Sequence, residues 1–446
     1  MNEPIKRLRL PGALAFNREE RMESSMVHSQ ETAVTRAFPN GLTVAVEPLP
    51  HVRSVSAGVW IKTGSVNEPQ EQGGISHFLE HLLFKGTTRR SARELVEAIE
   101  RHGGQINAFT SRDYTCIYVK VLDNHWVTGI DVLCDIINNS VLSDVEKERN
   151  VILEEIASIE DVPEELAHDI LTEQMWPEHP LGRPIPGSSQ CVQRLSRADL
   201  SDYYHRWYHP GNLIVAVAGH VEPEAVFEQV AAQFEDAPAR PDAAPTTEAP
   251  KFSPGVEKAV RDISQSHFCF GFPGPTPLSE DRYVYDLLCS ALGGGSTSRL
   301  FEKIREDEGL AYAIYAFHSA YYLAGMFGVY AAVAPENLDR TLELCASELR
   351  DFRDNPMTET ELELNREQLK GGLLMALENT SSRSSRLAKS LIYHNRILSV
   401  DELVGAIDQV TSGHVQKLAQ SIFQPEKLCM VVVGPHRGKS LAPLAL

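Results

Sequence analysis

A segment rich in proline and alanine divides the sequence into two halves that follow the same pattern. Residues 236–250, DAPARPDAAPTTEAP, show no apolar periodicity, which is typical of a linker between folded units. The first half ends in WYHPGNLIVAVAG, and the second half ends in the similar stretch IFQPEKLCMVVVG. Each stretch has the pattern of a helix end, a turn and an apolar strand that closes in glycine. The pattern therefore predicts a duplicated α+β unit.

The length of the chain agrees with this division. A chain of 446 residues exceeds what one hydrophobic core usually supports, so two domains of roughly 200 residues each are expected. The predicted parts are a disordered N-terminal extension at 1–34, a first α+β domain at 35–235, a linker at 236–252 and a second α+β domain at 253–440. The extension lacks the apolar stretch of a secretory signal.

Apolar periodicity places the same kinds of element in both halves. Asn40-Gly41 predicts a hairpin, Ser91 predicts a helix start, and Ser143 with Glu146 predicts a capping box. In the first half the patterns predict strands within 52–65, 106–121 and 212–221 and helices at 73–85, 91–102, 125–139 and 143–161. In the second half they predict strands at 267–275, 312–333 and 427–435 and helices at 281–291, 299–308, 335–353 and 358–378. The predicted fold class is α+β, with an antiparallel-rich sheet and packed helices in each domain.

Charge and cysteine usage limit the partners and the compartment. The formal net charge of −19 argues against nucleic acid and anionic membrane as partners, because both repel an acidic surface. The same charge hints at basic peptides as substrates, although acidity is also a common solubility feature. The seven cysteines stand singly without a CxxC pair, which predicts buried thiols in a reducing compartment, the cytoplasm. The longest apolar runs are too short to cross a bilayer.

The stretch ISHFLEHLLFKG, residues 75–86, places two histidines and a glutamate in an apolar run. In a helix His77 and His81 lie on one face, so both imidazoles face a common point. Two neutral nitrogens suit zinc, and Glu80 can stand beside such a metal and accept a proton from bound water. The pattern H-x-x-E-H is the reverse of the metalloprotease H-E-x-x-H. Two histidines that are satisfied within a core or an interface are the alternative interpretation.

A catalytic zinc site needs a third protein ligand, and the segment SDVEKERNVILEEIASIE (143–160) offers acidic candidates. Two turns of helix separate Glu148 from Glu155, so both project from the same side. Glu154 and Glu160 are further candidates. An acidic helix face in contact with solvent is the alternative interpretation for all four residues.

These two segments together resemble a known family. GGISHFLEHLLFKGT, followed about 70 residues later by ERNVILEEI, resembles the pitrilysin/insulinase family of inverted zinc metallopeptidases, and specifically its processing-peptidase-like branch. The resemblance extends over nearly the whole chain. It implies that His77, His81 and Glu155 bind Zn²⁺. It also implies that Glu80 is the general base and Glu148 an assisting acid.

A third segment, GGQINAFTSRDYTCIYVKV, resembles the family's edge strand, to which a substrate peptide adds as an extra strand. The resemblance implies that the backbone at Asn107, Ala108 and Phe109 binds an extended peptide, because main-chain pairing accepts many sequences. An ordinary hairpin with a polar turn is compatible with the same residues.

In the second half, ALGGGSTSRLFEKIREDEGLAYAIYAF resembles the family's glycine-rich loop and its Arg/Tyr pair. The resemblance implies that Gly293, Gly294 and Gly295 bind substrate and that Arg305 and Tyr312 donate to the oxyanion of a tetrahedral intermediate. Without the family, Arg305 is one charge of a solvated helix and Tyr312 a strand residue. No G-x-x-x-x-G-K-[ST] motif is present, which excludes a phosphate loop of that kind.

The resemblance implies a zinc metalloendopeptidase that cleaves unfolded peptides or presequence-like segments bound as an added strand inside a closed chamber. The family's chamber contains four α+β units and this chain has two, so a homodimer is expected, with Arg305 and Tyr312 reaching the zinc of the partner protomer. A heterodimer with a paralogue is the alternative assembly. A non-catalytic assembly subunit is the alternative function, although such members usually lose parts of the zinc motif, which this chain retains.

Overall fold

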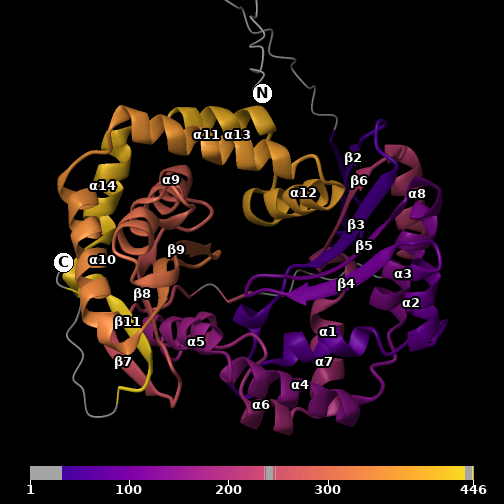
Figure 1. Ribbon diagram of the computed structural model, residues 1–446. Helices are drawn as coiled ribbons and strands as arrows, with labels where there is room; N and C mark the ends of the chain where they lie inside the picture. The colour runs from indigo at the N-terminus through magenta and orange to yellow at the C-terminus, as the bar shows by residue number, and fades with distance from the viewer. Residues whose placement is uncertain (1–32, 236, 238–244, 247, 437–443, 445) are drawn as a thin grey trace, which may run out of the picture. The chain divides into compact units, whose positions relative to one another are not determined.

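Two β-sheets, each covered by helices, make up the described chain (Figure 1). The computed structural model describes residues 33–235, 237, 245–246, 248–436, 444 and 446, all within one unit, Thr32–Leu446. The extension predicted at 1–34 lies outside the described residues except for its last two positions, and Val34 already opens a strand. Residues 236, 238–244 and 247 of the predicted linker also lie outside the described part.

The first sheet contains six strands in the order β1-β2-β6-β3-β5-β4. Its strands are β1 (Val34–Ala37), β2 (Thr43–Pro48), β3 (Ser54–Ile61), β4 (Gln105–Thr110), β5 (Thr115–Leu122) and β6 (Leu213–Gly219). β2 and β6 run parallel, and the other neighbouring pairs are antiparallel. The predicted hairpin joins β1 to β2: Gly41 has a φ of +91°, and a Cβ there would lie 2.7 Å from the Cα of Gly211. Both constraints require glycine at this turn.

The second sheet repeats the order of the first without β1. Its order is β7-β11-β8-β10-β9, with β7 and β11 parallel and the other pairs antiparallel, as in β2-β6-β3-β5-β4. Its strands are β7 (Gly255–Val260), β8 (Ser266–Gly274), β9 (Ala311–Ala320), β10 (Gly325–Val333) and β11 (Cys429–Gly434). The predicted duplication of an α+β unit is therefore confirmed at the level of topology. Of these strands, only β7 was not predicted.

Helices follow the strands in the same order in the two halves. The first half contains α1 (Ile75–Leu83), α2 (Ala92–Glu100), α3 (Trp126–Asn139), α4 (Val145–Glu160), α5 (Pro163–Met175), α6 (Ser189–Arg194), α7 (Arg197–Trp207) and α8 (Pro223–Gln233). The second half contains α9 (Arg282–Gly293), the π-helical segment η6 (Phe301–Asp307), α10 (Leu338–Asp354), α11 (Glu359–Ala376), α12 (Thr380–His394), α13 (Val400–Asp408) and α14 (Ser412–Ile422). Short 3-10 turns are η1 (Ser65–Asn67), η2 (Gln70–Gln72), η3 (Asp123–His125), η4 (Pro180–Gly182), η5 (Pro210–Asn212), η7 (Pro335–Asn337) and η8 (Pro425–Lys427).

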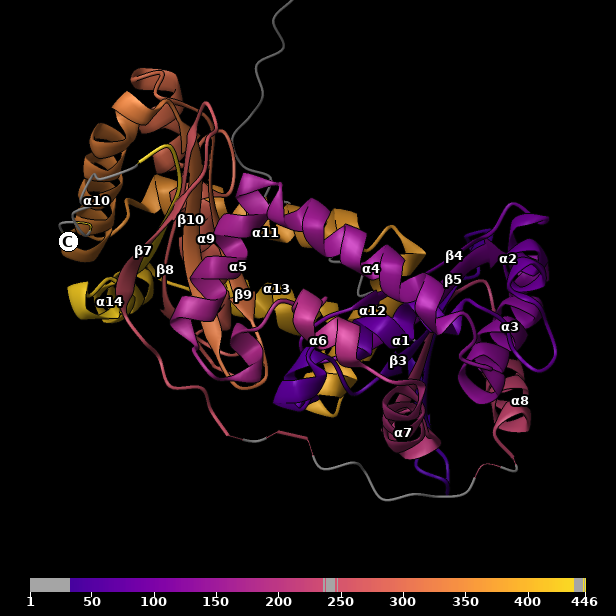
Figure 2. The ribbon, with the colours of Figure 1, turned by 90° about the horizontal axis from the view of Figure 1, so that it is seen from below.

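Each half packs one helix against the sheet of the other half. Helix α5, from the first half, packs on β8 and β11, and helix α12, from the second half, packs on β3 and β6 (Figures 1 and 2). Ser384 of α12 donates a hydrogen bond of 2.9 Å to the carbonyl oxygen of Ala216 on β6. Arg383 and Arg386 of α12 pair with the buried carboxylate of Glu47 on β2. The sequence patterns predicted neither α12 nor this exchange of helices.

Each sheet packs one of its faces against a large apolar core of its own. One core lies between the first sheet and α1, α3 and α7, and a corresponding core lies between the second sheet and α9, α10 and α14. Two smaller clusters lie under α5 and α12. In the described residues all seven cysteines are free thiols, and six of them are buried. Among the described helices, none combines the length and the apolar character that a membrane span requires.

Candidate metal centre

Helix α1 carries the two predicted histidine ligands into a buried position. Phe78, Leu79, Leu82 and Leu83 are fully buried in the first core, which fixes the rotation of the helix about its axis, and His77 is 8% exposed. This packing leaves His77 and His81 on the side that faces α4. The apolar run around the motif therefore sets the direction of both imidazoles.

A buried carboxylate caps the N-terminus of α1. Glu68 accepts hydrogen bonds from the backbone nitrogens of Gly74, at 2.8 Å, and Ser76, at 2.9 Å. These are donors that a helix N-terminus otherwise leaves unpaired. Burial raises the pKa of Glu68 to about 7, although the two backbone hydrogen bonds act in the opposite direction. The cap holds the first turn of the helix that carries both histidines.

Helix α4 begins differently from the prediction. Its N-cap is Asp144, in the left-handed region with a φ of +59°, and no side chain caps the helix there. The capping box predicted from Ser143 and Glu146 is wrong because each side chain has another partner. Ser143 donates to the carbonyl oxygen of Lys85 at 3.0 Å, which ties α4 to the end of α1, and Glu146 pairs with Arg149 at 3.0 Å.

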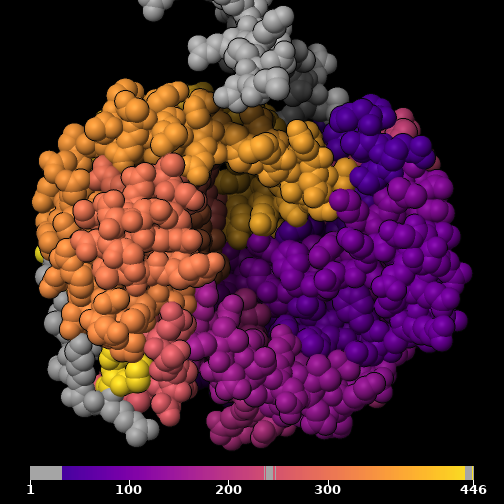
Figure 3. Space-filling view, viewed as in Figure 1, coloured from indigo at the N-terminus to yellow at the C-terminus, as the bar shows by residue number. Residues whose placement is uncertain are grey.

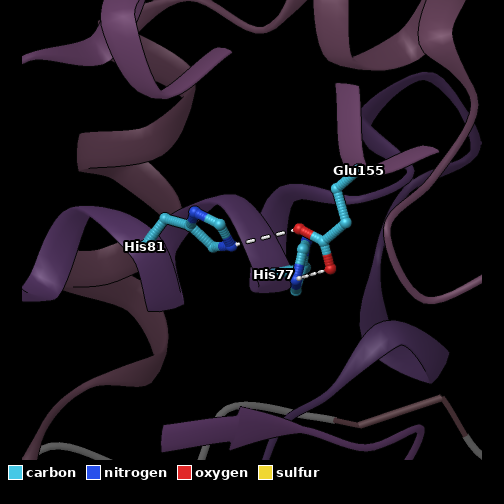
Figure 4. Close-up of side chains that lie close together, drawn as sticks. All are labelled: His77, His81 and Glu155. Carbon is cyan, nitrogen blue, oxygen red and sulfur yellow. Dashed lines mark ion pairs between the residues drawn. The ribbon is translucent and has the colours of Figure 1, made fainter. Parts of the chain in front are cut away.

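Three predicted ligands converge between α1 and α4 (Figure 4). The Nε2 of His77 lies 3.6 Å from Oε1 of Glu155, and the Nε2 of His81 lies 3.5 Å from Oε2 of the same carboxylate. One ligand atom from each residue lies within 4.8 Å of the other two. Tetrahedral zinc has ligand bonds of roughly 2.0–2.2 Å to nitrogen and oxygen, which separates its ligand atoms by slightly more than 3 Å. The donor set and its spacing therefore fit zinc.

The environment of His77 favours the neutral imidazole that a metal requires. Burial, and to a lesser extent the neighbouring His81, lowers the pKa of His77 to about 4. Its Nδ1 is buried and has no hydrogen-bond partner in the described part of the chain. A charged ring would bury two N–H donors in this position, so protonation is disfavoured.

Glu148 lies behind His81. Its Oε2 is 3.4 Å from Nδ1 of His81, on the opposite edge of the ring from Glu155. The carboxylate is 3% exposed and also pairs with the ammonium of Lys85 at 2.9 Å. A carboxylate beside the second nitrogen of a metal-binding histidine fixes the orientation and tautomer of the ring.

Glu80 and Thr110 connect α1 to the edge strand β4. The Thr110 hydroxyl donates a hydrogen bond of 2.6 Å to Oε2 of Glu80. Burial raises the pKa of Glu80, which the Thr110 hydrogen bond and the nearby His81 partly oppose, while Glu155 raises it further. Glu80 is thus a partly buried carboxylate with one oxygen fixed, in the electrostatic neighbourhood of two of the predicted ligands.

Strand β4, which contains the predicted peptide-binding residues, lies at the end of the first sheet. The backbone nitrogen of Ala108 donates a hydrogen bond of 2.8 Å to the side chain of Asn107. The side chains alternate, so that Phe109 is 37% exposed on one face while Thr110 reaches Glu80 on the other. The described strand therefore offers a backbone edge beside the Glu80 carboxylate.

The residues predicted in the second half lie on or beside the second sheet. Gly293 ends α9, and a Cβ there would lie 2.1 Å from the backbone nitrogen of Ala316 on β9. Gly294 and Gly295 follow it. Arg305 and Tyr312 contact each other: the guanidinium donates to the Tyr312 carbonyl oxygen at 2.8 Å and lies 4.8 Å from the ring centroid. Figure 1 shows β9 well apart from α1, and the Tyr312 side chain is 81% exposed. Within one protomer the structure does not bring this pair to the histidines.

Comparisons with known proteins identify relatives of this chain. The profile described as "Insulinase (Peptidase family M16)" matches residues 43–189, and "Peptidase M16 inactive domain" matches residues 194–369. An uncharacterized zinc protease of Streptomyces coelicolor is 37% identical over 426 residues, which cover 94% of this chain and 93% of that protein. The chain belongs to peptidase family M16.

A further relative and two solved structures resemble this chain in sequence or in fold. An uncharacterized zinc protease of Bacillus subtilis is 37% identical over 398 residues, covering 89% of this M16 chain and 97% of that protein. The crystal structure of a protease from Helicobacter pylori superposes with a TM-score of 0.85 at 23% identity, covering 91% of this chain and 100% of that one. A structure from Pseudomonas fluorescens titled as a peptidase M16 inactive domain gives a TM-score of 0.84 at 18% identity, covering 92% and 99%. The predicted family and fold class are confirmed.

Two residues that position the site of this M16 chain were not predicted. Glu68 lies outside α1 and caps its N-terminus. The sequence signal for this cap is only an acidic residue shortly before the Gly73-Gly74 pair at which the helix begins. Thr110 lies 30 positions from its partner Glu80, so no local pattern links them.

Proposed function

We propose that this M16 chain is a zinc-dependent endopeptidase of the processing-peptidase type, cleaving unfolded peptides or presequence-like segments. The observation that carries the proposal is the convergence of His77, His81 and Glu155 within 4.8 Å, with the Glu80 carboxylate beside them. Two imidazoles and one carboxylate leave a fourth position of a tetrahedral metal for water, which is typical of catalytic rather than structural zinc.

Each remaining residue of the site has a role that follows from its contacts. Zinc, when bound, supplies a polarised water and positive charge near the scissile carbonyl. Glu80 accepts a proton and later delivers it to the leaving amine, and the Thr110 hydroxyl holds the carboxylate in place through Oε2. Glu148, behind Nδ1 of His81, orients that ring rather than facing the reacting atoms. The peptide pairs with the free edge of β4, which aligns it without reading its sequence.

A set of three glutamate variants tests this proposal. Glu80→Gln is expected to keep stoichiometric zinc, measured by mass spectrometry of the metal, and to lose cleavage of a quenched peptide. Glu155→Gln is expected to lose both zinc and cleavage. Glu154→Gln is the matched control, because that neighbour on α4 is exposed, and it should keep both properties. Turnover by Glu80→Gln would contradict the role of general base.

The alternative of a non-catalytic assembly subunit gives a different result in the same assay. The wild-type protein would then cleave no peptide, with or without a chelator. The complete ligand set argues for catalysis, because a scaffold has no need for metal ligands at this spacing.

We also propose a homodimer in which Arg305 and Tyr312 act on the site of the partner protomer. The exposure of the Tyr312 side chain and its location on β9, away from α1, support this role. Mixing two inactive variants, Glu80→Gln and Tyr312→Phe, tests it. Exchange of protomers creates mixed dimers with one intact site, so activity should return. If the mixture stays inactive after the protomers have exchanged, Arg305 and Tyr312 do not act on the site of the partner protomer.

A further inference from the structure

A groove of about 650 Å³ runs between the first sheet and the helix that the second half contributes to it. Its floor is formed by β3 and β5, including Trp60 and Tyr118, and one wall by Gln105 and Phe109 of β4. The other wall is the end of α11 and the beginning of α12. Figure 3 shows a hollow in the middle of the molecule, which the gold-coloured part of the chain borders.

The groove lies on the opposite face of β4 from the proposed general base. Thr110 contacts Glu80 on one face, whereas its neighbour Phe109 lines the groove on the other. Side chains of a strand that pairs with β4 alternate in the same way. A peptide bound at this edge therefore directs every second side chain into the groove while its backbone passes Glu80.

The charges of the groove are all positive. The cations lining it are Lys120, Arg386 and Lys389, and none of the described lining residues is an aspartate or a glutamate. This contrasts with the formal net charge of −19 of the whole chain. Arg386 is neutralised locally, because it pairs with the carboxylate of Glu47 at 3.3 Å.

The two lysines are not neutralised in this way. The ammonium of Lys120 lies 3.4 Å from the Oδ1 of Asn379, a neutral amide, and the ammonium of Lys389 lies 6.0 Å from the ring centroid of Tyr114. In the described part of the chain no carboxylate lies within ion-pair distance of either. Although Lys389 remains exposed at its edge of the groove, partial desolvation lowers the pKa of its ammonium. A carboxylate placed beside either ammonium group would supply the missing charge partner.

The start of α12 adds uncharged donors to the same wall. Ser381, Ser382 and Ser385 line the groove within the first two turns of this helix. Backbone dipoles make the N-terminal end of a helix favourable for negative charge. Hydroxyl donors, a helix start and two ammonium groups thus border one groove.

From these observations we infer that the groove is a subsite for an acidic side chain of the peptide substrate, with Lys120 and Lys389 as its specificity-determining residues. The inference rests on the proposed endopeptidase function and on peptide pairing with β4. It reverses the expectation of basic substrates drawn from the total charge, because the local charge of the groove is opposite to that of the chain. The aromatic floor contacts the methylene groups of a glutamate while an ammonium group of the groove binds its carboxylate.

Matched fluorogenic peptides test the subsite. One series carries Glu, Gln or Lys at a single position that is moved along an otherwise identical peptide. The wild-type protein is expected to cleave the Glu peptide with a kcat/KM about tenfold above that of the Gln isostere at one position, and not at the two positions beside it. A ratio near one at every position would overturn the inference.

Variants assign the effect to the two lysines. The double variant Lys120→Gln/Lys389→Gln should bring the Glu-to-Gln ratio close to one, and the charge reversal Lys389→Glu should favour the Lys peptide instead. Lys417→Gln, which removes an exposed lysine of α14 outside the groove, should leave the ratio unchanged. A preference for Glu that survives in the double variant would also overturn the inference.

A binding measurement separates this inference from the proposed function. If the wild-type protein cleaves none of the peptides, the endopeptidase proposal fails. Fluorescence anisotropy of the same labelled peptides with the Glu80→Gln protein then gives the ratio of the dissociation constants for Glu and Gln. A tighter Glu peptide that loses its advantage in the double variant supports the subsite, and equal dissociation constants overturn it.

Discussion

Glu47 provides a sharp test of how the two halves are held together. This glutamate lies on β2 of the first sheet, and its carboxylate accepts from Arg383 and Arg386 of α12. The Glu47 side chain is 3% exposed and that of Arg386 is 9% exposed, so the pair is shielded from water. Glu47→Gln keeps the size of the side chain and removes its charge.

The structure sets the expected magnitude. Removing one partner of a buried ion pair costs about 3–5 kcal/mol, because the other charge stays buried without compensation. Arg383 also donates to the carbonyl oxygen of Leu377, and Arg386 to that of Leu398, so neither guanidinium would lose all its partners. The expected cost is therefore at the lower end of this range, about 3 kcal/mol. A loss of about 3 kcal/mol in the docking of α12 corresponds to roughly a hundredfold larger equilibrium constant for its opening.

Hydrogen exchange measured by mass spectrometry is the assay, since it reports on residues 380–394 separately from the rest of the chain. The matched control is Glu224→Gln, which removes the carboxylate of a long-range pair with Arg36 whose side chains are 72% and 41% exposed. An exposed pair of this kind contributes about 0–1 kcal/mol. Equal protection of α12 in the two variants would refute the reasoning that the buried pair holds this helix.

Three further outcomes are expected. Chelation of divalent ions should lower the Tm of the wild-type protein, and added zinc should restore it. An ion that binds only the folded state, at about a thousandfold excess over its Kd, stabilises that state by roughly 4 kcal/mol. His77→Ala should show no such response in thermal unfolding. Glu68 has a pKa of about 7 in the folded protein and about 4.5 when exposed, so the folded state holds more protons than the unfolded state between these pH values. The free energy of unfolding should therefore fall by up to about 3 kcal/mol as the pH rises through this window. Urea unfolding measures this loss, which should be absent in Glu68→Gln. A water-soluble maleimide should label Cys191 rapidly in the native protein, because it is the half-buried one of the seven free thiols, and Cys191→Ser should abolish the fast phase.

Local sequence patterns were sufficient to place the two histidines on one helix face and to predict most elements. The four-residue spacing of His77 and His81 and the seven-residue spacing of Glu148 and Glu155 follow from helix geometry alone, so a reader of the sequence can place them on common faces. Which glutamate faces the two histidines could not be decided by spacing, and the resemblance to the family indicated Glu155. The structure brings that residue, and not Glu154, to the histidines.

The features that were missed depend on contacts that are distant in sequence. Helix α12, TSSRSSRLAKSLIYH, contains many serines and arginines and buries only a narrow stripe that includes Leu387 and Ala388, so its apolar signal is weak. Its stability depends on the first sheet, which lies more than 150 positions earlier in the sequence. The capping box at Ser143 failed for the same reason, since its hydroxyl bonds to Lys85 on another helix. Tertiary partners, which no short pattern contains, decide these cases.

The exchange of α5 and α12 has a consequence for biosynthesis. A ribosome completes the strands of the first sheet at Gly219, but the helix that covers one of its faces is synthesised only at residues 380–394. Until then the nascent chain exposes Trp60 and its apolar neighbours to the surrounding solution, where chaperones bind such surfaces. A gene cut at the proline-rich segment would yield two fragments that each lack a cover for one face, so soluble protein should be recovered only when both are produced in the same cell.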